Sequence, residues 1–149
     1  MSHKVLEGEF VVKETFYISG NKDELSKSQV VELLKKSGWA HDREDEQIEK
    51  SIENSICYGL FSDNKNLIGF ARIITDFVTT FYLMDVIIKE EYRGRGLGKM
   101  LMDEIMKDVG HLYGILHTES AQEFYKPYGF KVTATFESGE SIMEKRKEV

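Results

Sequence analysis

The segment from 80 to 109 constrains the fold most, because an apolar run, a glycine-rich turn and an amphipathic repeat follow one another there. The run TFYLMDVIIK (80–89) is apolar at nearly every position, which is typical of a central strand covered on both faces. Only Asp85 interrupts it. Apolar residues then recur at helical spacing from Leu97 to Val109. The sequence therefore predicts a buried strand that leads through a tight turn into a helix.

The remaining elements follow from shorter patterns. Runs rich in β-branched and aromatic residues predict strands at 10–19, 57–63, 67–76 and 112–118, and a closing hairpin from 130–138 and 141–147. Three further helices are predicted. One follows a possible capping box at Ser26 and Gln29, and another carries Ile48, Ile52 and Ile56 along its apolar stripe. The third is short and lies within 120–129. This order predicts an α/β (α+β) fold with a mixed, mostly antiparallel central sheet of six to seven strands, flanked by about four helices.

Composition limits the partners and the compartment. A chain of 149 residues is the usual size of one domain, so we expect a single domain over 1–149. The net charge of −6 argues against a broad surface for nucleic acid or for an anionic membrane. Cys57 is the single cysteine, and no Cys and His spacing suits a metal. With no signal-peptide pattern at the start, we expect a cytoplasmic protein without a metal.

The glycine-rich turn, EYRGRGLGKM (91–100), concentrates positive charge in an acidic chain. The first turn of a helix leaves backbone N–H groups without partners and carries partial positive charge, so it suits an anion. Three glycines admit a phosphate to those amides, and three basic side chains add charge: Gly94, Gly96, Gly98, Arg93, Arg95 and Lys99. The alternative is a flexible, solvated surface turn. A Walker A loop is excluded because Met100 follows Lys99, and the Rossmann spacing does not match.

Two stretches resemble a known family. VIIKEEYRGRGLG (86–98) is similar to motif A of the GCN5-related N-acetyltransferase (GNAT) superfamily, and SAQEFYKPYGF (120–130) is similar to its second landmark. The matching positions are Arg93, Gly96 and Gly98 in the first stretch, and Ala121, Tyr125, Gly129 and Phe130 in the second. The segments 37–61 and 69–76 further resemble a bacterial subgroup of undefined substrate. The resemblance covers essentially the whole chain.

The resemblance implies direct acetyl transfer from acetyl-CoA to an amine of a small molecule or peptide. In that family the central strand splays from its neighbour, and pantetheine inserts between the two. Backbone groups of the central strand would contact pantetheine and the thioester, and amides of the turn would hold the pyrophosphate. Thr118 stands where many relatives carry an Asn that contacts the CoA arm. The cofactor contacts expected on this basis are Val86, Ile87, Ile88, Arg93, Gly94, Arg95, Gly96, Leu97, Gly98, Lys99 and Thr118.

The resemblance also suggests catalytic residues. Tyr125 matches the tyrosine that family members often place near the CoA sulfur as general acid, and its alternative is aromatic packing. Asp85 is the candidate general base, since a partly buried carboxylate can have a raised pKa. Its alternative is a hydrogen-bonded core aspartate that orders a neighbouring loop. Weaker candidates for the base are Asp76, Glu119 and His117, and a water chain could replace any of them.

The acceptor is expected where the two N-terminal helices meet the sheet. Candidate lining residues, each with an ordinary structural alternative, are Trp39, His41, Tyr58, Arg72 and Asp76. Cys57 is expected to be a small core residue rather than an acetyl carrier. Homodimers are common in the family, but no seam in this sequence specifies one. The rival hypothesis is a non-catalytic module with the same fold that binds acyl-CoA as a sensor or interaction domain.

Overall fold

The structure is a computed structural model that describes residues 2–7, 10–38 and 40–148. Its described part contains eight strands in one sheet, in the order β1-β2-β3-β4-β5-β6-β8-β7. The strands are β1 (Ser2–Glu7), β2 (Phe10–Ser19), β3 (Ile56–Ser62), β4 (Leu67–Thr75), β5 (Thr80–Ile88), β6 (Tyr113–Thr118), β7 (Lys131–Thr135) and β8 (Ser141–Lys145). The α-helices are α1 (Lys27–Lys35), α2 (Asp45–Glu53), α3 (Leu97–Val109) and α4 (Gln122–Tyr125).

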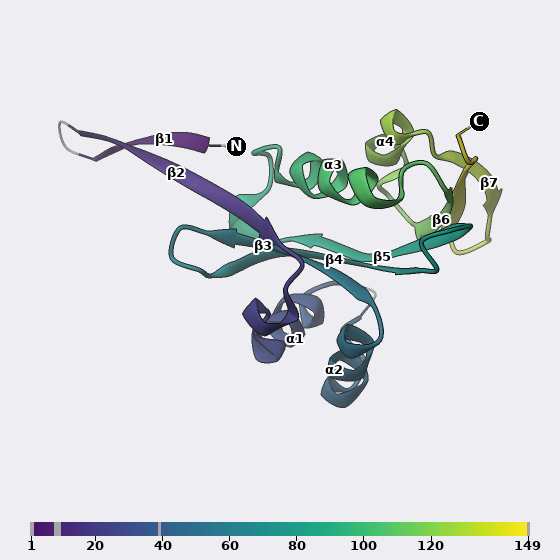
Figure 1. Ribbon diagram of the computed structural model, residues 1–149, viewed down its shortest axis with the longest axis horizontal. Coiled ribbons are helices and arrows are strands. Elements are labelled where there is room, and N and C mark those ends of the chain that lie inside the picture. Colours follow the sequence, from purple (N-terminus) through teal and green to yellow (C-terminus); the bar gives the residue numbers. More distant parts are fainter. Residues whose placement is uncertain (1, 8–9, 39, 149) are drawn as a thin grey trace.

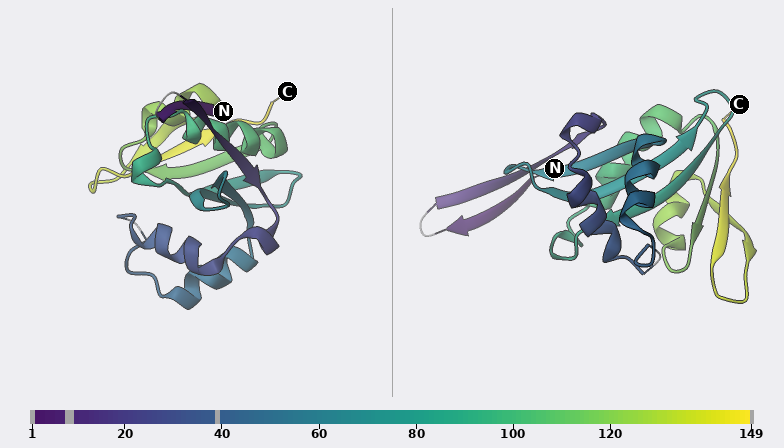
Figure 2. Two further views of the ribbon diagram at one scale, coloured as in Figure 1. Left: turned by 90° about the vertical axis from the view of Figure 1, so that its left-hand side faces the viewer. Right: turned by 90° about the horizontal axis from the view of Figure 1, so that it is seen from below.

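The helices form two layers with the sheet between them. In Figure 1, α3 and α4 lie above the sheet, and α1 and α2 lie below it. The view from below in Figure 2 shows α1 and α2 side by side across the sheet. Each layer buries its own apolar cluster. One cluster joins α3 to the sheet through residues such as Leu101 and Ile105, and the other joins α1 and α2 to it through residues such as Leu34 and Ile48.

The pairing of the strands confirms the predicted mixed, mostly antiparallel sheet, because among the described strands only β5 and β6 run parallel. The predicted sheet of six to seven strands is confirmed by β2 to β8, and the described residues contain β1 in addition. β1 pairs only with β2, and this hairpin extends past the rest of the sheet (Figure 1). A strand as polar as SHKVLE has little strand signal of its own, since its conformation depends on the pairing partner.

Strand β5 departs from the prediction of a strand covered on both faces, because buried and half-buried residues alternate along it. The face of the sheet to which alternate side chains point also changes within β5. Leu83 packs into the α3 cluster, whereas Ile87, four residues later, packs into the cluster of α1 and α2. Asp85 lies between them with a φ of 56°, where the β4–β5 register slips between Phe70 and Arg72. This β-bulge bends the strand and turns its later side chains to the opposite face.

Two predicted helix details need correction. Ser26 caps α1 by accepting a hydrogen bond from Gln29 N, but the Gln29 side chain accepts from Leu67 N rather than from the cap, so the box is only half formed. Ile56 does not belong to the second helix. That helix ends at Glu53, and Ile56 begins β3 opposite Ile73. Ile48, Ile52 and Ile56 are four residues apart, but this spacing continues past the end of the helix only by coincidence.

No helix in the described part of the chain combines the length and the apolarity needed to cross a membrane.

Candidate active site

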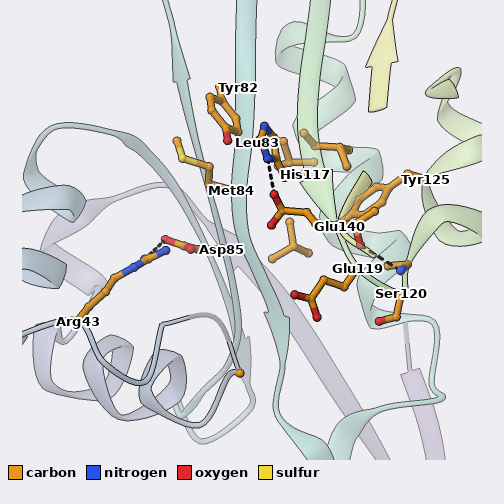
Figure 3. A pocket seen from close by; sticks show the side chains of 15 residues that line it. Arg43, Tyr82, Leu83, Met84, Asp85, His117, Glu119, Ser120, Tyr125 and Glu140 are labelled. Atoms are coloured by element: carbon orange, nitrogen blue, oxygen red, sulfur yellow. Dashed lines mark hydrogen bonds and ion pairs between the residues drawn. The ribbon is translucent and has the colours of Figure 1, made fainter. Parts of the chain in front are cut away.

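The parting of β5 and β6 opens a cavity between the two strands. The two parallel strands pair only from Thr80 to Tyr82 on β5, and past that point they diverge. A cavity of about 510 Å³ occupies the opening, lined on one side by residues 82–86 of β5 and on the other by residues 116–121. Tyr125 completes the floor, and Gly38, Arg43 and Glu140 reach the cavity from loops (Figure 3). The predicted splay of the central strand is therefore present.

The edge of β5 that faces this cavity is suited to an extended ligand. Its other edge is paired with β4, where Ile87 lies opposite Phe70 and Ile88 lies opposite Gly69. Because backbone N–H and C=O groups are strong hydrogen-bonding groups, a strand edge without a neighbouring strand can pair with an extended chain of amides. Val86 lines the cavity itself. The three predicted contacts Val86, Ile87 and Ile88 thus lie on the segment of β5 beyond the paired region.

Tyr125 lies in the cavity wall and is almost entirely buried, at 7% exposure. Burial raises the pKa of its phenol to about 12. Its ring makes edge contacts with Phe124 and Phe130, so packing fixes its position as well. Both interpretations of this residue are compatible with its environment: an aromatic cluster holds the ring, and the cavity reaches the side chain.

Thr118 lines the same cavity at the end of β6. Its Oγ1 accepts a hydrogen bond of 3.0 Å from the backbone N of Ala121. The hydroxyl thus fixes the turn that leads into α4. Thr118 remains beside the opening, but its described interaction stabilises the chain that positions Tyr125.

Asp85 is held between two arginines. Its Oδ2 accepts hydrogen bonds from Arg72 Nε at 2.6 Å and from Arg43 Nη1 at 2.9 Å, and its side chain is only 2% exposed. Burial alone would raise the pKa of Asp85, but the hydrogen bonds and charges of Arg43 and Arg72 outweigh it and lower the pKa. The expectation of a raised pKa is therefore wrong. The arrangement matches the alternative of a core aspartate that orders a loop, because Arg43 lies in the segment between α1 and α2.

The opposite wall carries the other ionisable groups. His117 Nδ1 lies 3.0 Å from Glu140 Oε1, and the His117 ring stacks on Tyr82 with ring centroids 5.7 Å apart. Glu119 follows β6 and lines the cavity. In Figure 3 the carboxylates of Glu119 and Glu140 point into the opening, across from Arg43 and Asp85. Sequence reasoning named His117 and Glu119 only as weak candidates, and it missed Glu140 and Arg43, since no pattern links them to 80–100.

The glycine-rich turn precedes α3 in the predicted way. Gly94 and Gly96 have φ angles of 78° and 77°, in the left-handed region that favours glycine. The first helical hydrogen bond runs from Met100 N to Gly96 O, so the amides of Leu97, Gly98 and Lys99 precede the hydrogen-bond ladder of the helix. At Gly98 a side chain is disfavoured by packing rather than by φ, because a Cβ there would lie 3.2 Å from the Phe124 ring. It lets α4 pack closely against the start of α3.

The basic side chains of the turn already have partners within the protein. Arg93 Nε donates to the Ile88 carbonyl at 3.0 Å, and Lys99 pairs with Asp103 at 2.6 Å. Arg95 pairs with Glu14 at 2.7 Å and lies over the Tyr92 ring. These contacts hold the turn against β5, β2 and α3. Backbone amides, rather than free basic side chains, are therefore the main feature that the turn offers to an anion.

The residues expected to line the acceptor site are mostly placed elsewhere. Tyr58 is buried and donates to Asp108 on α3, on the other face of the sheet. Asp76 caps the β4–β5 turn by accepting from Thr79 and Val78, and these hydrogen bonds lower its pKa. His41 contacts the Gly38 carbonyl, and Arg72 binds Asp85 below the cavity. Trp39 lies outside the described residues.

Cys57 lies in the core and is 1% exposed. Burial raises the pKa of its thiol to about 11, so the thiolate needed for an acetyl carrier is disfavoured. The interpretation as a small core residue is confirmed by this burial.

Comparison with known proteins identifies the family. The model of the acetyltransferase (GNAT) family matches residues 24–130, which include β5, the glycine-rich turn, α3 and Tyr125. The chain belongs to the GNAT acetyltransferase family. An N-acetyltransferase of Gracilaria tenuistipitata var. liui, ycf52, whose function is uncharacterized, is 31% identical over 135 residues, which is 85% of this chain and 72% of that protein. This GNAT protein is thus an N-acetyltransferase, within the acyltransferase class.

Solved structures agree on the fold of this GNAT enzyme. A crystal structure of an acetyltransferase assigned to the GNAT family, from Xanthomonas campestris pv. campestris, is 34% identical with a TM-score of 0.74, over 78% of this chain and 84% of that one. An aminoglycoside 6'-N-acetyltransferase complexed with coenzyme A has a TM-score of 0.72 at 20% identity, over 87% of this chain and 96% of that one. The second likeness concerns the fold alone.

Proposed function

We propose that this chain binds acetyl-CoA between β5 and β6 and moves the acetyl group directly to an amine that enters from the side of α1 and α2. The parting of the two strands beside Tyr125 is the observation that carries the proposal. An extended pantetheine arm, with its two amides, suits the β5 edge formed by Val86, Ile87 and Ile88. We place the diphosphate on the amides of the turn from Gly94 to Lys99.

The residues of the turn fit a diphosphate. Gly94 and Gly96 are exposed and hold left-handed conformations, and a Cβ at Gly94 would meet no atom within 4 Å, so the approach to the backbone is open. The helix that follows has 13 residues, long enough for its N-terminal dipole to favour an anion. Arg93 and Arg95 border the turn and would add long-range attraction while they keep their present partners. Leu97 contributes only its amide, since its side chain is in the core.

The transfer step needs a positioned amine, a site for developing negative charge and a proton donor. The amine nitrogen forms a bond to the thioester carbon, the C–S bond breaks, and the sulfur leaves as a thiolate that takes a proton. A backbone N–H on the free edge of β5 stabilises the developing oxyanion. Tyr125 supplies the proton to sulfur, because its pKa of about 12 keeps the phenol protonated at neutral pH.

The proton lost by the amine goes to a carboxylate or water on the Glu119 and Glu140 wall. We assign Asp85 to positioning, because its lowered pKa makes it a weak base and its two arginine partners occupy it. Through its two arginine partners, Asp85 fixes the position of the β5 bulge relative to the loop that contains Arg43.

A thiol-release assay with acetyl-CoA and a panel of amines tests this function. We expect release of free CoA that depends on an added amine, together with an N-acetylated product. Binding of CoA without acceptor-dependent release from any amine would instead identify a binding module.

A further inference from the structure

The cavity of this enzyme has two walls of opposite charge, and nothing in the proposed chemistry requires the positive one. Arg43 lies on one wall, and Glu119 and Glu140 lie on the other (Figure 3). An amine acceptor is attracted to carboxylates, but a guanidinium beside the same opening repels it. The wall with Arg43 therefore calls for a different group on the acceptor.

The charge on the Arg43 wall is not cancelled by Asp85. The cluster contains two guanidinium groups, from Arg43 and Arg72, around one carboxylate. Arg72 is the inner member, with its side chain 10% exposed and a further hydrogen bond of 3.2 Å to Ser55 Oγ. Arg43 is the outer member, with its side chain 32% exposed. The excess positive charge thus lies on the side of the cavity.

Arg43 also has hydrogen-bond donors to offer. A guanidinium carries several N–H groups in a planar fork that matches a carboxylate. The described contact of Arg43 with Asp85 uses Nη1 alone. Because Asp85 fixes the head group from one side, the remaining donors are preorganised, and less side-chain entropy is lost on binding a ligand.

The opposite wall is suited to the ammonium form of the acceptor before transfer. Glu140 is oriented by His117, and Glu119 is joined through residues 120–124 to Tyr125. The amine must react near Tyr125, so its place is on this wall. A second, anionic group of the acceptor then faces Arg43.

We propose that the acceptor is an amine that also carries a carboxylate, and that Arg43 binds this carboxylate. This inference rests on the proposed function, and it narrows the acceptor to amino acids and related amino carboxylates. Simple polyamines and other acceptors without an anionic group are disfavoured, because they leave the Arg43 donors unpaired and meet its charge. Asp85 positions Arg43 and does not touch the acceptor.

The test compares matched amines that differ only in the carboxylate. Glycine, β-alanine, 4-aminobutyrate and 5-aminopentanoate are assayed beside their carboxamides at saturating acetyl-CoA, with rates expressed per concentration of unprotonated amine. We expect at least one spacing for which kcat/KM of the carboxylate exceeds that of its carboxamide by about tenfold or more. Equal or better use of every carboxamide would overturn the inference.

Variants locate the effect at Arg43. We expect Arg43→Gln to raise KM for the preferred carboxylate at least about tenfold and to leave its carboxamide within about twofold, so that the preference disappears. Arg43→Lys keeps a cation and is expected to retain part of the preference. Lys107→Gln, on the exposed face of α3, is the control and should change neither rate. An equal loss for both members of each pair would show that Arg43 acts only on the fold.

The outcomes distinguish a failure of this inference from a failure of the proposed function. If CoA binds but no amine of either series releases thiol, both the proposed function and this inference are refuted. If carboxylates and carboxamides release thiol equally, the transferase function stands and only the role of Arg43 is refuted. Should Arg43→Gln fold poorly in thermal unfolding, the wild-type preference and its reduction in Arg43→Lys still decide the question.

Discussion

Asp85 and Arg72 are joined by a hydrogen bond of 2.6 Å between Oδ2 and Nε, at the point where the β4–β5 register slips. The ion pair and the bulge lie side by side, and the cavity opens from the same segment of β5. The conformation that separates β5 from β6 is therefore tied to a buried charged cluster rather than to apolar packing alone.

The first prediction concerns this cluster. Asp85→Ala leaves two guanidinium groups without their shared carboxylate, and we expect a loss of about 3 kcal/mol in the free energy of unfolding at neutral pH. Urea unfolding followed by circular dichroism measures it. Glu119→Ala, an exposed carboxylate on the same cavity, is the control and should lose less than about 0.5 kcal/mol.

The pH dependence of stability should report the same cluster. The arginines lower the pKa of Asp85, so its contribution is complete above the pKa of an unfolded aspartate, about 3.9, and is lost as the pH falls through the lower folded-state pKa. The difference in unfolding free energy between wild type and Asp85→Asn should therefore shrink as the pH is lowered from 5 toward the acid limit of folding. A difference that grows on acidification contradicts the assignment.

Tyr125 offers a test of the chemistry. Tyr125→Phe removes the proton donor to sulfur while keeping the ring, and we expect kcat to fall at least about tenfold with little change in the affinity for acetyl-CoA. Because burial raises the pKa of Tyr125 to about 12, the donor stays protonated and should cause no loss of kcat between about pH 7 and 10. Tyr128→Phe, in the same aromatic cluster, is the matched control. Wild-type turnover in Tyr125→Phe would refute its role.

Gly96 tests the diphosphate site. Its φ of 77° makes Gly96→Ala cost roughly 1–2 kcal/mol of backbone strain, and relief of that strain would turn the following amides away. We expect the Kd for CoA to rise at least about tenfold in calorimetry. Gly139→Ala carries similar strain, with a φ of 93° in the β7–β8 turn, and should leave the Kd for CoA unchanged. Equal effects of both substitutions on the Kd would point to general destabilisation.

Gly114 tests the junction at which β5 and β6 stop pairing. A Cβ at Gly114 would lie 2.3 Å from Phe81 Cζ, and Phe81 is fully buried, so the ring has to move. Gly114→Ala is expected to destabilise the fold by about 1–3 kcal/mol, measured by chemical denaturation. Gly20→Ala is the control, because its Cβ would meet only the Cys57 carbonyl at an ordinary 3.5 Å.

Much of the fold could be predicted because its signals are local. The helix from Leu97 to Val109 has a regular apolar stripe, and the turn before it has alternating glycines, so both lie where the sequence places them. Ile56 and β1 were missed for the opposite reason. A spacing of four residues cannot show that a helix has ended, and the polar strand β1 depends on its pairing with β2.

The contacts on the side proposed for the acceptor could not be predicted from the sequence, for a related reason. Arg43 and Asp85 are 42 residues apart, and His117 and Glu140 are 23 apart, so only the topology of the sheet brings each pair together. The lowered pKa of Asp85 likewise depends on two partners from different elements. Local patterns predicted the side of the cavity proposed for CoA, whereas long-range contacts form the side proposed for the acceptor.

The central claim is that β5, β6 and the turn before α3 form one binding site for acetyl-CoA, and a crystal structure of the protein with coenzyme A tests it most directly. We predict pantetheine between β5 and β6, hydrogen-bonded along 86–88, with the diphosphate on the amides of 94–99 and the sulfur beside Tyr125. Coenzyme A bound elsewhere, or an opening closed by protein when coenzyme A is saturating, would contradict the account.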